Sequence, residues 1–190
     1  MNNIRYYQVE SNVADRQYTT IESDLANKVT GKELDIFDVD SALQAVVATT
    51  TNSRPLSDFL ACYDEWFLVS ERALEALNAC HVCPSVRWIE TTVCTRRRKV
   101  LATYWLAYGA KAIDVWNYNL SDCYWHDPAV PGDARLPGML LKGVLGTSGI
   151  PVGVDLFWAT HRTWIASSHL REVVITSKLS GFCFSELGVG

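Results

Sequence analysis

The chain has 190 residues, of which 48% are hydrophobic, and a formal net charge of −4. This length fits one domain or two small ones that share a core, and the composition is that of a soluble globular protein rather than a disordered one. The acidic balance argues against nucleic-acid binding, because nucleic-acid-binding domains are more often basic.

Targeting and redox features indicate the cytosol. The longest apolar run, 100–110, is too short to span a bilayer as a helix, and the first residues contain no apolar signal-peptide core. The six cysteines are scattered through apolar contexts, which in a cytosolic protein predicts buried thiols rather than disulfides. We therefore expect a cytoplasmic protein that does not contact the membrane.

The sequence predicts short strands and two helices. The first strand is expected at "IRYYQV" (4–9), and "LDIFDVDSALQAVV" (34–47) is expected to begin extended. "LSDFLACYD" (56–64) has apolar spacing that could form one helical turn. Further strands are predicted at 66–69, 86–93, 139–145, 164–166 and 181–187, and helices are predicted after Ser70 and after Ser167 or Ser168, whose hydroxyls suit an N-cap.

One phrase occurs twice, as "WFLVSERALEAL" (66–77) and as "TWIASSHLREVV" (163–174). Asp58 lies twelve residues before Ser70, and Asp155 lies twelve residues before Ser167. The matched order predicts an internal pseudo-repeat, about 56–93 and 153–189, within a single domain that covers residues 1–190. We interpret the phrase as scaffold, with the serines as helix caps and the tryptophans in the core.

The expected fold class is α+β, with two related strand–helix–strand units packed with a central apolar segment. That segment, "VLATYWLAYGAKAIDVWNYNLSDCYW" (100–125), is so uniformly apolar that periodicity does not distinguish a helix from a buried strand. Glycine and proline concentrate in 128–153, which predicts loops there.

Two motifs could bind ligands but are better explained by structure. "CHVC" (80–83) supplies half of a tetrahedral zinc site, and the sequence has no second close pair of cysteines. The motif also follows a predicted helix, at the wrong pole to activate a redox thiol. "RRRK" (96–99) could contact phosphates, but such a run is more typical of a solvated turn between strands. We expect no metal, no cofactor and no direct nucleic-acid contact.

No motif indicates catalysis. His126 stands beside Asp127, but adjacency alone does not give a catalytic dyad its geometry. "GTSGIP" (146–151) is not the G-x-S-x-G nucleophile elbow, and the sequence has neither a P-loop nor a G-x-G-x-x-G motif. We therefore predict no catalytic residue and do not expect an enzyme.

Taken in order, the phrases resemble those of a bacterial family of immunity proteins from polymorphic-toxin systems, first catalogued as a domain of unknown function. The resemblance spans most of the chain, whereas 121–138 has no counterpart in the family pattern. The matching stretches are "IRYYQV", "RPLSDFL", "WFLVSERALEAL", "YWLAYGAKAIDVWN", "LLKGVLGTSGIPVGVDLFW", "WIASSHL" and "GFCFSEL".

The resemblance implies a binding protein without catalytic residues. Such proteins are encoded beside a toxin gene, act in the cytosol and neutralise the cognate toxin domain by direct stoichiometric contact. The toxins are often nucleases delivered between competing bacteria. Blocking of the toxin's active cleft is favoured over remote inhibition. The alternative function is a small cytosolic enzyme or ligand-binding domain that uses a pocket between the two halves.

The irregular aromatic stretch 116–127 is the candidate partner-binding surface. It lies outside both repeats, and loops on a rigid scaffold commonly carry binding residues. The competing interpretation places these aromatic side chains in the core between the repeats. The candidate contact residues are Trp116, Tyr118, Asp122, Trp125 and Asp127.

Overall fold

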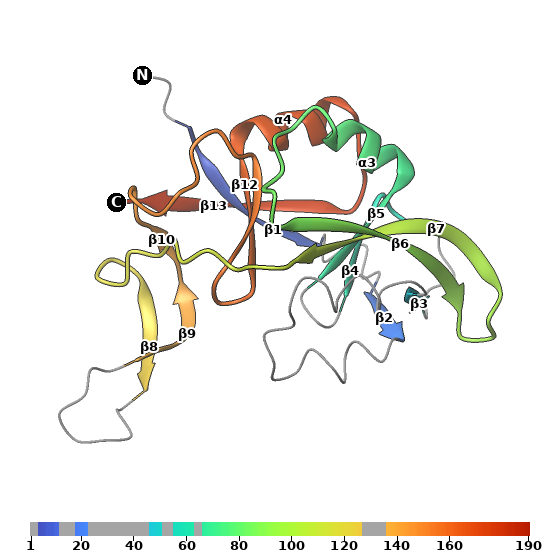
Figure 1. Ribbon diagram of the computed structural model, residues 1–190, viewed down its shortest axis with the longest axis horizontal. Helices are drawn as coiled ribbons and strands as arrows, with labels where there is room; N and C mark the ends of the chain where they lie inside the picture. The colour runs from blue at the N-terminus through green and yellow to red at the C-terminus, as the bar shows by residue number, and fades with distance from the viewer. Residues whose placement is uncertain (1–3, 12–17, 23–45, 51–54, 63–65, 127–135) are drawn as a thin grey trace.

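A computed structural model describes residues 4–11, 18–22, 46–50, 55–62, 66–126 and 136–190 (Figure 1). The strands are β1 (Tyr6–Ser11), β2 (Tyr18–Glu22), β3 (Val46–Thr50), β4 (Phe59–Cys62), β5 (Phe67–Ser70), β6 (Val86–Thr95), β7 (Val100–Gly109), β8 (Asp122–His126), β9 (Leu136–Lys142), β10 (Val144–Leu145), β11 (Leu156–Ala159), β12 (Thr163–Ser167) and β13 (Phe182–Val189). The helices are α3 (Glu71–Leu77) and α4 (Ser168–Thr176).

The described part of the chain is mostly β, so the predicted α+β class is wrong. Six strands form a sheet that closes on itself in the order β2-β3-β6-β7-β5-β4, and five more form a second sheet in the order β10-β13-β1-β12-β11. The strands on either side of each helix therefore belong to large curled sheets rather than to separate strand–helix–strand units. The two helices lie side by side at one end of the molecule (Figure 1).

The first part of the central apolar segment is a strand of the first sheet. β7 spans its first ten residues and pairs with β5 on one side and β6 on the other. Residues 104–108 of β7 are buried or half-buried, whereas Val100 and Leu101 are exposed, and Val115 and Trp116 of the same segment belong to the main core. The length and composition of a segment do not reveal how many neighbours it has, so periodicity alone did not decide its structure.

The segment 56–64 also differs from its prediction. Phe59–Cys62 form β4, and the preceding Asp58 lies at the start of that strand rather than in a helical turn. For 34–47, only the last two residues lie within the described part of the chain, and they belong to β3.

The two sheets repeat the same strand order and register. β4-β5-β7-β6-β3 in the first sheet matches β11-β12-β1-β13-β10 in the second, including a parallel pair at the end of each series. Ser70 lies opposite Tyr104 in the first sheet, as Ser167 lies opposite Tyr6 in the second. β1 comes first in the chain yet belongs to the second sheet, and β7 opens the second half yet belongs to the first. The two halves therefore exchange their first strands.

Both helices begin at a capping serine, as predicted. Ser70 Oγ accepts from the amide of Ala73 at 3.2 Å and donates to Asp58 Oδ1 at 2.7 Å. Ser167 Oγ accepts from the third amide beyond it at 3.3 Å and donates to Asp155 Oδ1. The repeated Asp and Ser therefore join the start of α3 to the start of β4, and the start of α4 to the start of β11.

Each aspartate is also held by a loop from the opposite half. Ser180, which follows α4, donates its amide and its hydroxyl to Asp58 Oδ2 at 2.8 and 2.9 Å. His81, which follows α3, donates its amide to Asp155 Oδ2 at 2.9 Å. The two loops therefore tie the halves together reciprocally.

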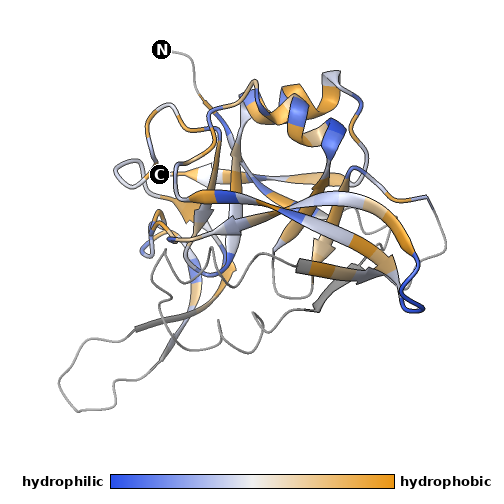
Figure 2. Ribbon diagram, turned by 45° about the vertical axis from the view of Figure 1, so that its right-hand side comes forward, coloured by the Kyte–Doolittle hydropathy of each residue, from blue (hydrophilic) through white to orange (hydrophobic). Residues whose placement is uncertain are grey.

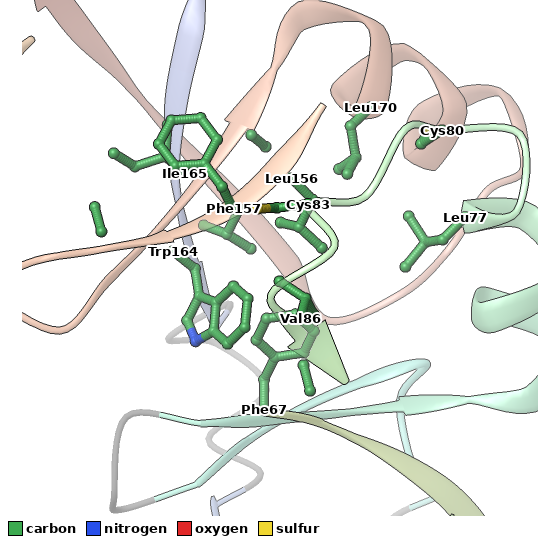
Figure 3. Close-up of a cluster of buried hydrophobic side chains, with 14 of the residues drawn as sticks. Phe67, Leu77, Cys80, Cys83, Val86, Leu156, Phe157, Trp164, Ile165 and Leu170 are labelled. Carbon is green, nitrogen blue, oxygen red and sulfur yellow. The ribbon is translucent and has the colours of Figure 1, made fainter. Parts of the chain in front are cut away.

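The main hydrophobic core contains residues of both halves (Figure 3). Phe67 of β5 meets Trp164 of β12 with ring centroids 4.8 Å apart, and Phe157 and Ile165 are fully buried beside them. A second cluster, which includes Leu60 and other residues of the closed sheet, fills the interior of that sheet. Burial of each large apolar side chain contributes about 1.5–3 kcal/mol, so the shared core stabilises the two halves as one body.

Candidate protein-binding arm

β8 and β9 form a two-stranded arm that projects from the body of the protein (Figure 1). Among the described strands, these two pair only with each other. A two-stranded hairpin is marginally stable in water without a face packed against other structure. The arm therefore needs either support at its base or a partner along its faces.

The arm exposes large apolar side chains on both of its strands. Tyr124 lies on β8, and Met139 and Leu141 lie on β9, on either side of the Leu140 that pairs with Cys123. These three side chains are 59%, 65% and 59% exposed. Hydrophobic colour continues from the body onto the arm (Figure 2). Contiguous exposed apolar residues of this kind mark interaction surfaces.

A hydrogen-bonded aromatic cluster supports the base of the arm. The rings of Tyr118 and Trp125 meet edge to face with centroids 5.8 Å apart. Tyr118 Oη donates to Asp114 Oδ1 at 3.0 Å and lies 3.1 Å from His161 Nε2. Burial and the hydrogen bond to Asp114 raise the pKa of Tyr118, so its hydroxyl stays protonated and can donate at neutral pH. These contacts hold the inner part of the arm in place.

A cleft of about 760 Å³ opens where the arm joins the second sheet. Its charged and titratable lining comes from Glu10 of β1 and from His161 and Arg162 in the turn between β11 and β12. Both turn residues have a φ of 56°, a left-handed conformation that is costly for residues other than glycine. The remaining lining residues are Gln8, Trp116, Met139, Leu140, Leu141, Gly143 and Thr163.

The structure separates the predicted contact residues into distinct environments. Trp116 is buried, and its indole N–H donates to the carbonyl oxygen of Thr160 at 3.2 Å, so it belongs to the scaffold beneath the arm. Tyr118 is half-buried at the base, and Asp122 and Trp125 are exposed on β8. Asp127 lies outside the described residues.

The sequence predicted part of the other strand of the arm but not its exposure. "MLLKGVL" (139–145) predicted a strand, and the structure divides this segment between β9 and β10. The prediction gave no reason to expect Met139 and Leu141 at the surface, because an apolar strand is normally a buried one. The charged residues of the cleft, Glu10, His161 and Arg162, had no local motif either and come together only through the pairing of distant strands.

The other sequence motifs lie in a turn and in the core. Residues 96–99 form the exposed turn between β6 and β7, as predicted, and Figure 2 shows its hydrophilic tip. Cys80 and Cys83 are buried free thiols. Within the described residues, the single group with donor atoms close enough to hold a metal ion consists of Cys80, Asp155 and His169.

Both described helices are short, with 7 and 9 residues, and the part of the chain that the structure describes has no helix able to cross a membrane.

Comparison with known proteins gives no family assignment. No model of a known protein family matches the sequence, and no curated protein matches it.

Proposed function

We propose that this protein is a cytoplasmic immunity protein that binds a cognate bacterial toxin domain stoichiometrically through the β8–β9 arm and the cleft at its base. The observation that carries the proposal is the exposure of three large apolar side chains on the arm, Tyr124, Met139 and Leu141. The order of sequence phrases that resembles toxin-immunity proteins supplies the class of partner.

The arm has the composition of a binding hot spot. Aromatic residues and methionine are enriched at the centres of protein interfaces, where their large apolar area is removed from water. The supported base lowers the entropy that the arm loses on binding, because Tyr118 and Trp125 are already held in contact. A toxin must be neutralised at low concentration, which requires sub-nanomolar affinity, or about 12 kcal/mol or more.

Charge fits a basic partner. The chain carries a net charge of −4, and on the arm Asp122 is exposed opposite Lys142. Nuclease domains present basic clefts to their nucleic-acid substrates, so a negatively charged protein would capture such a toxin faster. We therefore favour a nuclease toxin whose active cleft the arm covers.

The first test is co-expression with the toxin domain encoded by the neighbouring gene. We expect survival of the host and a complex of one toxin per immunity protein that persists through purification. Continued killing without a complex would remove that toxin as the partner, and the same result with the other nearby toxin genes would contradict the proposed function.

The arm is tested by replacing Tyr124, Met139 and Leu141 together with alanine. Loss of three hot-spot side chains is expected to weaken binding at least a hundredfold. The control replaces three exposed apolar residues elsewhere, Ile4, Val152 and Ile175, with alanine. The control should bind within about threefold of wild type, and equal binding by both variants would show that the arm is not the interface.

A ligand-binding role of the cleft is the second candidate function. The observation that favours it is the combination of Glu10, His161 and Arg162 around one cleft. The lining residues come from the second sheet, its turn, the arm and the segments next to the arm, and none comes from a strand of the first sheet, so this cleft does not lie between the two sheets. A small-ligand screen by thermal shift tests this role. A response that Arg162→Ala abolishes, and that the triple alanine variant at Tyr124, Met139 and Leu141 keeps, would establish ligand binding by the cleft as separate from the role of the arm.

A further inference from the structure

Three segments that are distant in sequence bring a thiol, a carboxylate and an imidazole together. Cys80 follows α3, Asp155 precedes β11, and His169 lies in the first turn of α4. Their donor atoms all lie within 4.8 Å of one another. Asp155 Oδ2 and His169 Nδ1 are 3.1 Å apart, and the Cys80 side chain is buried.

The equivalent place in the other half shows what is unusual about this cluster. There Asp58 receives two hydrogen bonds from the Arg72 guanidinium, at 3.3 and 2.8 Å. Arg72 lies two residues after its capping serine, as His169 does after Ser167. Ser180 and His81 are the equivalent loop residues that bind Asp58 and Asp155, and Leu179 precedes the first as Cys80 precedes the second. Leu179 is therefore the equivalent of Cys80. The second half thus replaces a permanent cation and an aliphatic side chain with two groups that can bind a metal.

The types and spacing of these groups suit zinc. Ligand atoms in a tetrahedral zinc site lie about 2.0–2.3 Å from the ion, and so about 3.3–3.8 Å from one another. The 3.1 Å between Asp155 and His169 is close to that spacing, and the 4.8 Å limit of the cluster needs only a small rearrangement of side chains. A thiolate ligand favours zinc over calcium and magnesium, which prefer oxygen ligands.

The charges of the ligands favour a cation at this cluster. The positive end of α4 opposes a cation, but this effect is weak beside coordination by charged ligands. A thiolate and a carboxylate together would neutralise the charge of a zinc ion. A cavity of about 220 Å³, lined in part by Asp155 and His169, leaves room for a water molecule as the fourth ligand.

We propose that Cys80, Asp155 and His169 bind one zinc ion. The ion joins the loop after α3 to the starts of β11 and α4, which is the place that the Arg72–Asp58 pair takes in the other half. This site is independent of the proposed toxin binding, because it lies outside the arm and the cleft. Asp155 and His169 lie in segments far from "CHVC", so the local sequence around the two cysteines does not reveal them as ligands.

The test is metal titration of chelator-treated full-length protein with Zn²⁺ and with Co²⁺. We expect one ion per chain, a raised melting temperature with Zn²⁺, and a thiolate-to-cobalt charge-transfer band with Co²⁺. Cys80→Ser should abolish that band, and His169→Ala should weaken metal affinity more than tenfold. The His169 side chain is largely exposed, so its removal leaves the fold intact.

Matched controls come from the neighbouring thiol and from the other half. Cys83→Ser removes a buried cysteine outside the cluster, and Arg72→Ala changes the position equivalent to His169. Both should keep the cobalt band and the wild-type affinity. A wild-type protein without the band, or a band that persists in Cys80→Ser, would overturn the proposal.

Discussion

At the scale of single residues, the two partly buried aspartates, Asp58 and Asp155, are the points at which the halves depend on each other. Asp58 accepts hydrogen bonds from Ser70, Arg72 and Ser180, which come from both halves of the chain. Its side chain is only 13% exposed, so these donors would be left poorly solvated if the acceptor were lost. A partly buried carboxylate with this many donors is more costly to remove than an exposed one.

Asp58→Asn should therefore destabilise the protein by about 2–4 kcal/mol, because the variant loses the charge that Arg72 contacts and points an amide donor at other donors. Urea unfolding measures the change, with an unchanged slope showing that the unfolded state is not altered. Glu75→Gln, an exposed change on α3, should alter stability by less than about 0.5 kcal/mol. Equal stability of the two variants would show that the Asp58 contacts do not contribute.

The same residues predict loss of stability in acid. Burial raises the pKa values of Asp58 and Asp155, but hydrogen bonds from Arg72 and Ser180 to the first, and from Ser167 and His81 to the second, outweigh it, so both pKa values lie below the ordinary value. Each carboxylate therefore binds its proton more readily in the unfolded chain. Its contribution is complete above the unfolded pKa of about 3.9 and is lost as the pH falls through the folded pKa.

The free energy of unfolding should accordingly fall from about pH 4 downwards, and it should fall less steeply in Asp58→Asn, which has one such group fewer. Denaturant titrations at a series of pH values measure both slopes. An equally steep fall in the free energy of unfolding below pH 4 for the variant and the wild type would show that Asp58 does not contribute to the loss of stability in acid.

At the scale of elements, the sequence predicted features that depend on nearby residues, such as helix caps, but not which strands pair with one another. The caps at Ser70 and Ser167 depend on contacts within a few residues, and the structure confirms both. The structure of β7 depends on β5 and β6 on either side of it, and the exposure of β9 depends on the second sheet ending before it reaches the arm. The fold class was wrong for this reason: the phrases indicated helices and short strands correctly, but gave no information about how many strands share each sheet.

The turn between α4 and β13 offers a test of element geometry. Gly181 has a φ of +88°, and a Cβ there would lie 2.5 Å from the backbone oxygen of Phe59. Gly181→Ala combines backbone strain with a collision beside Ser180, so we expect a loss of about 2–4 kcal/mol in stability. Gly153 has a φ of +71° with open space around it, so Gly153→Ala should cost only about 1 kcal/mol. Urea midpoints compare the two, and equal losses would mean that the turn relaxes freely.

At the scale of the whole molecule, the exchange of first strands makes the halves interdependent. β1 lies between β12 and β13, and β7 lies between β5 and β6, so each sheet has a middle strand from the other half of the chain. The sequence showed a repeat of about 56–93 and 153–189, but the partners of β1 and β7 are set by pairing across the length of the chain. The matched registers are a property of the structure, and an internal duplication of the chain stays a prediction.

This exchange predicts that neither half folds by itself. Cutting the chain in the exposed turn at 96–99 would yield fragments 1–97 and 98–190, each without the strand that fills the middle of its sheet. Removal of a middle strand breaks two hydrogen-bonded ladders and uncovers the apolar side chains beneath it, so we expect no cooperative unfolding transition from either fragment. Mixing the fragments should restore the circular dichroism spectrum and a single transition. A chain cleaved in the same turn after folding is the control, and it should keep its structure because the cut removes no strand. A sharp transition from isolated 98–190 would show instead that the second sheet forms without β1, and that this half of the chain is an independent folding unit.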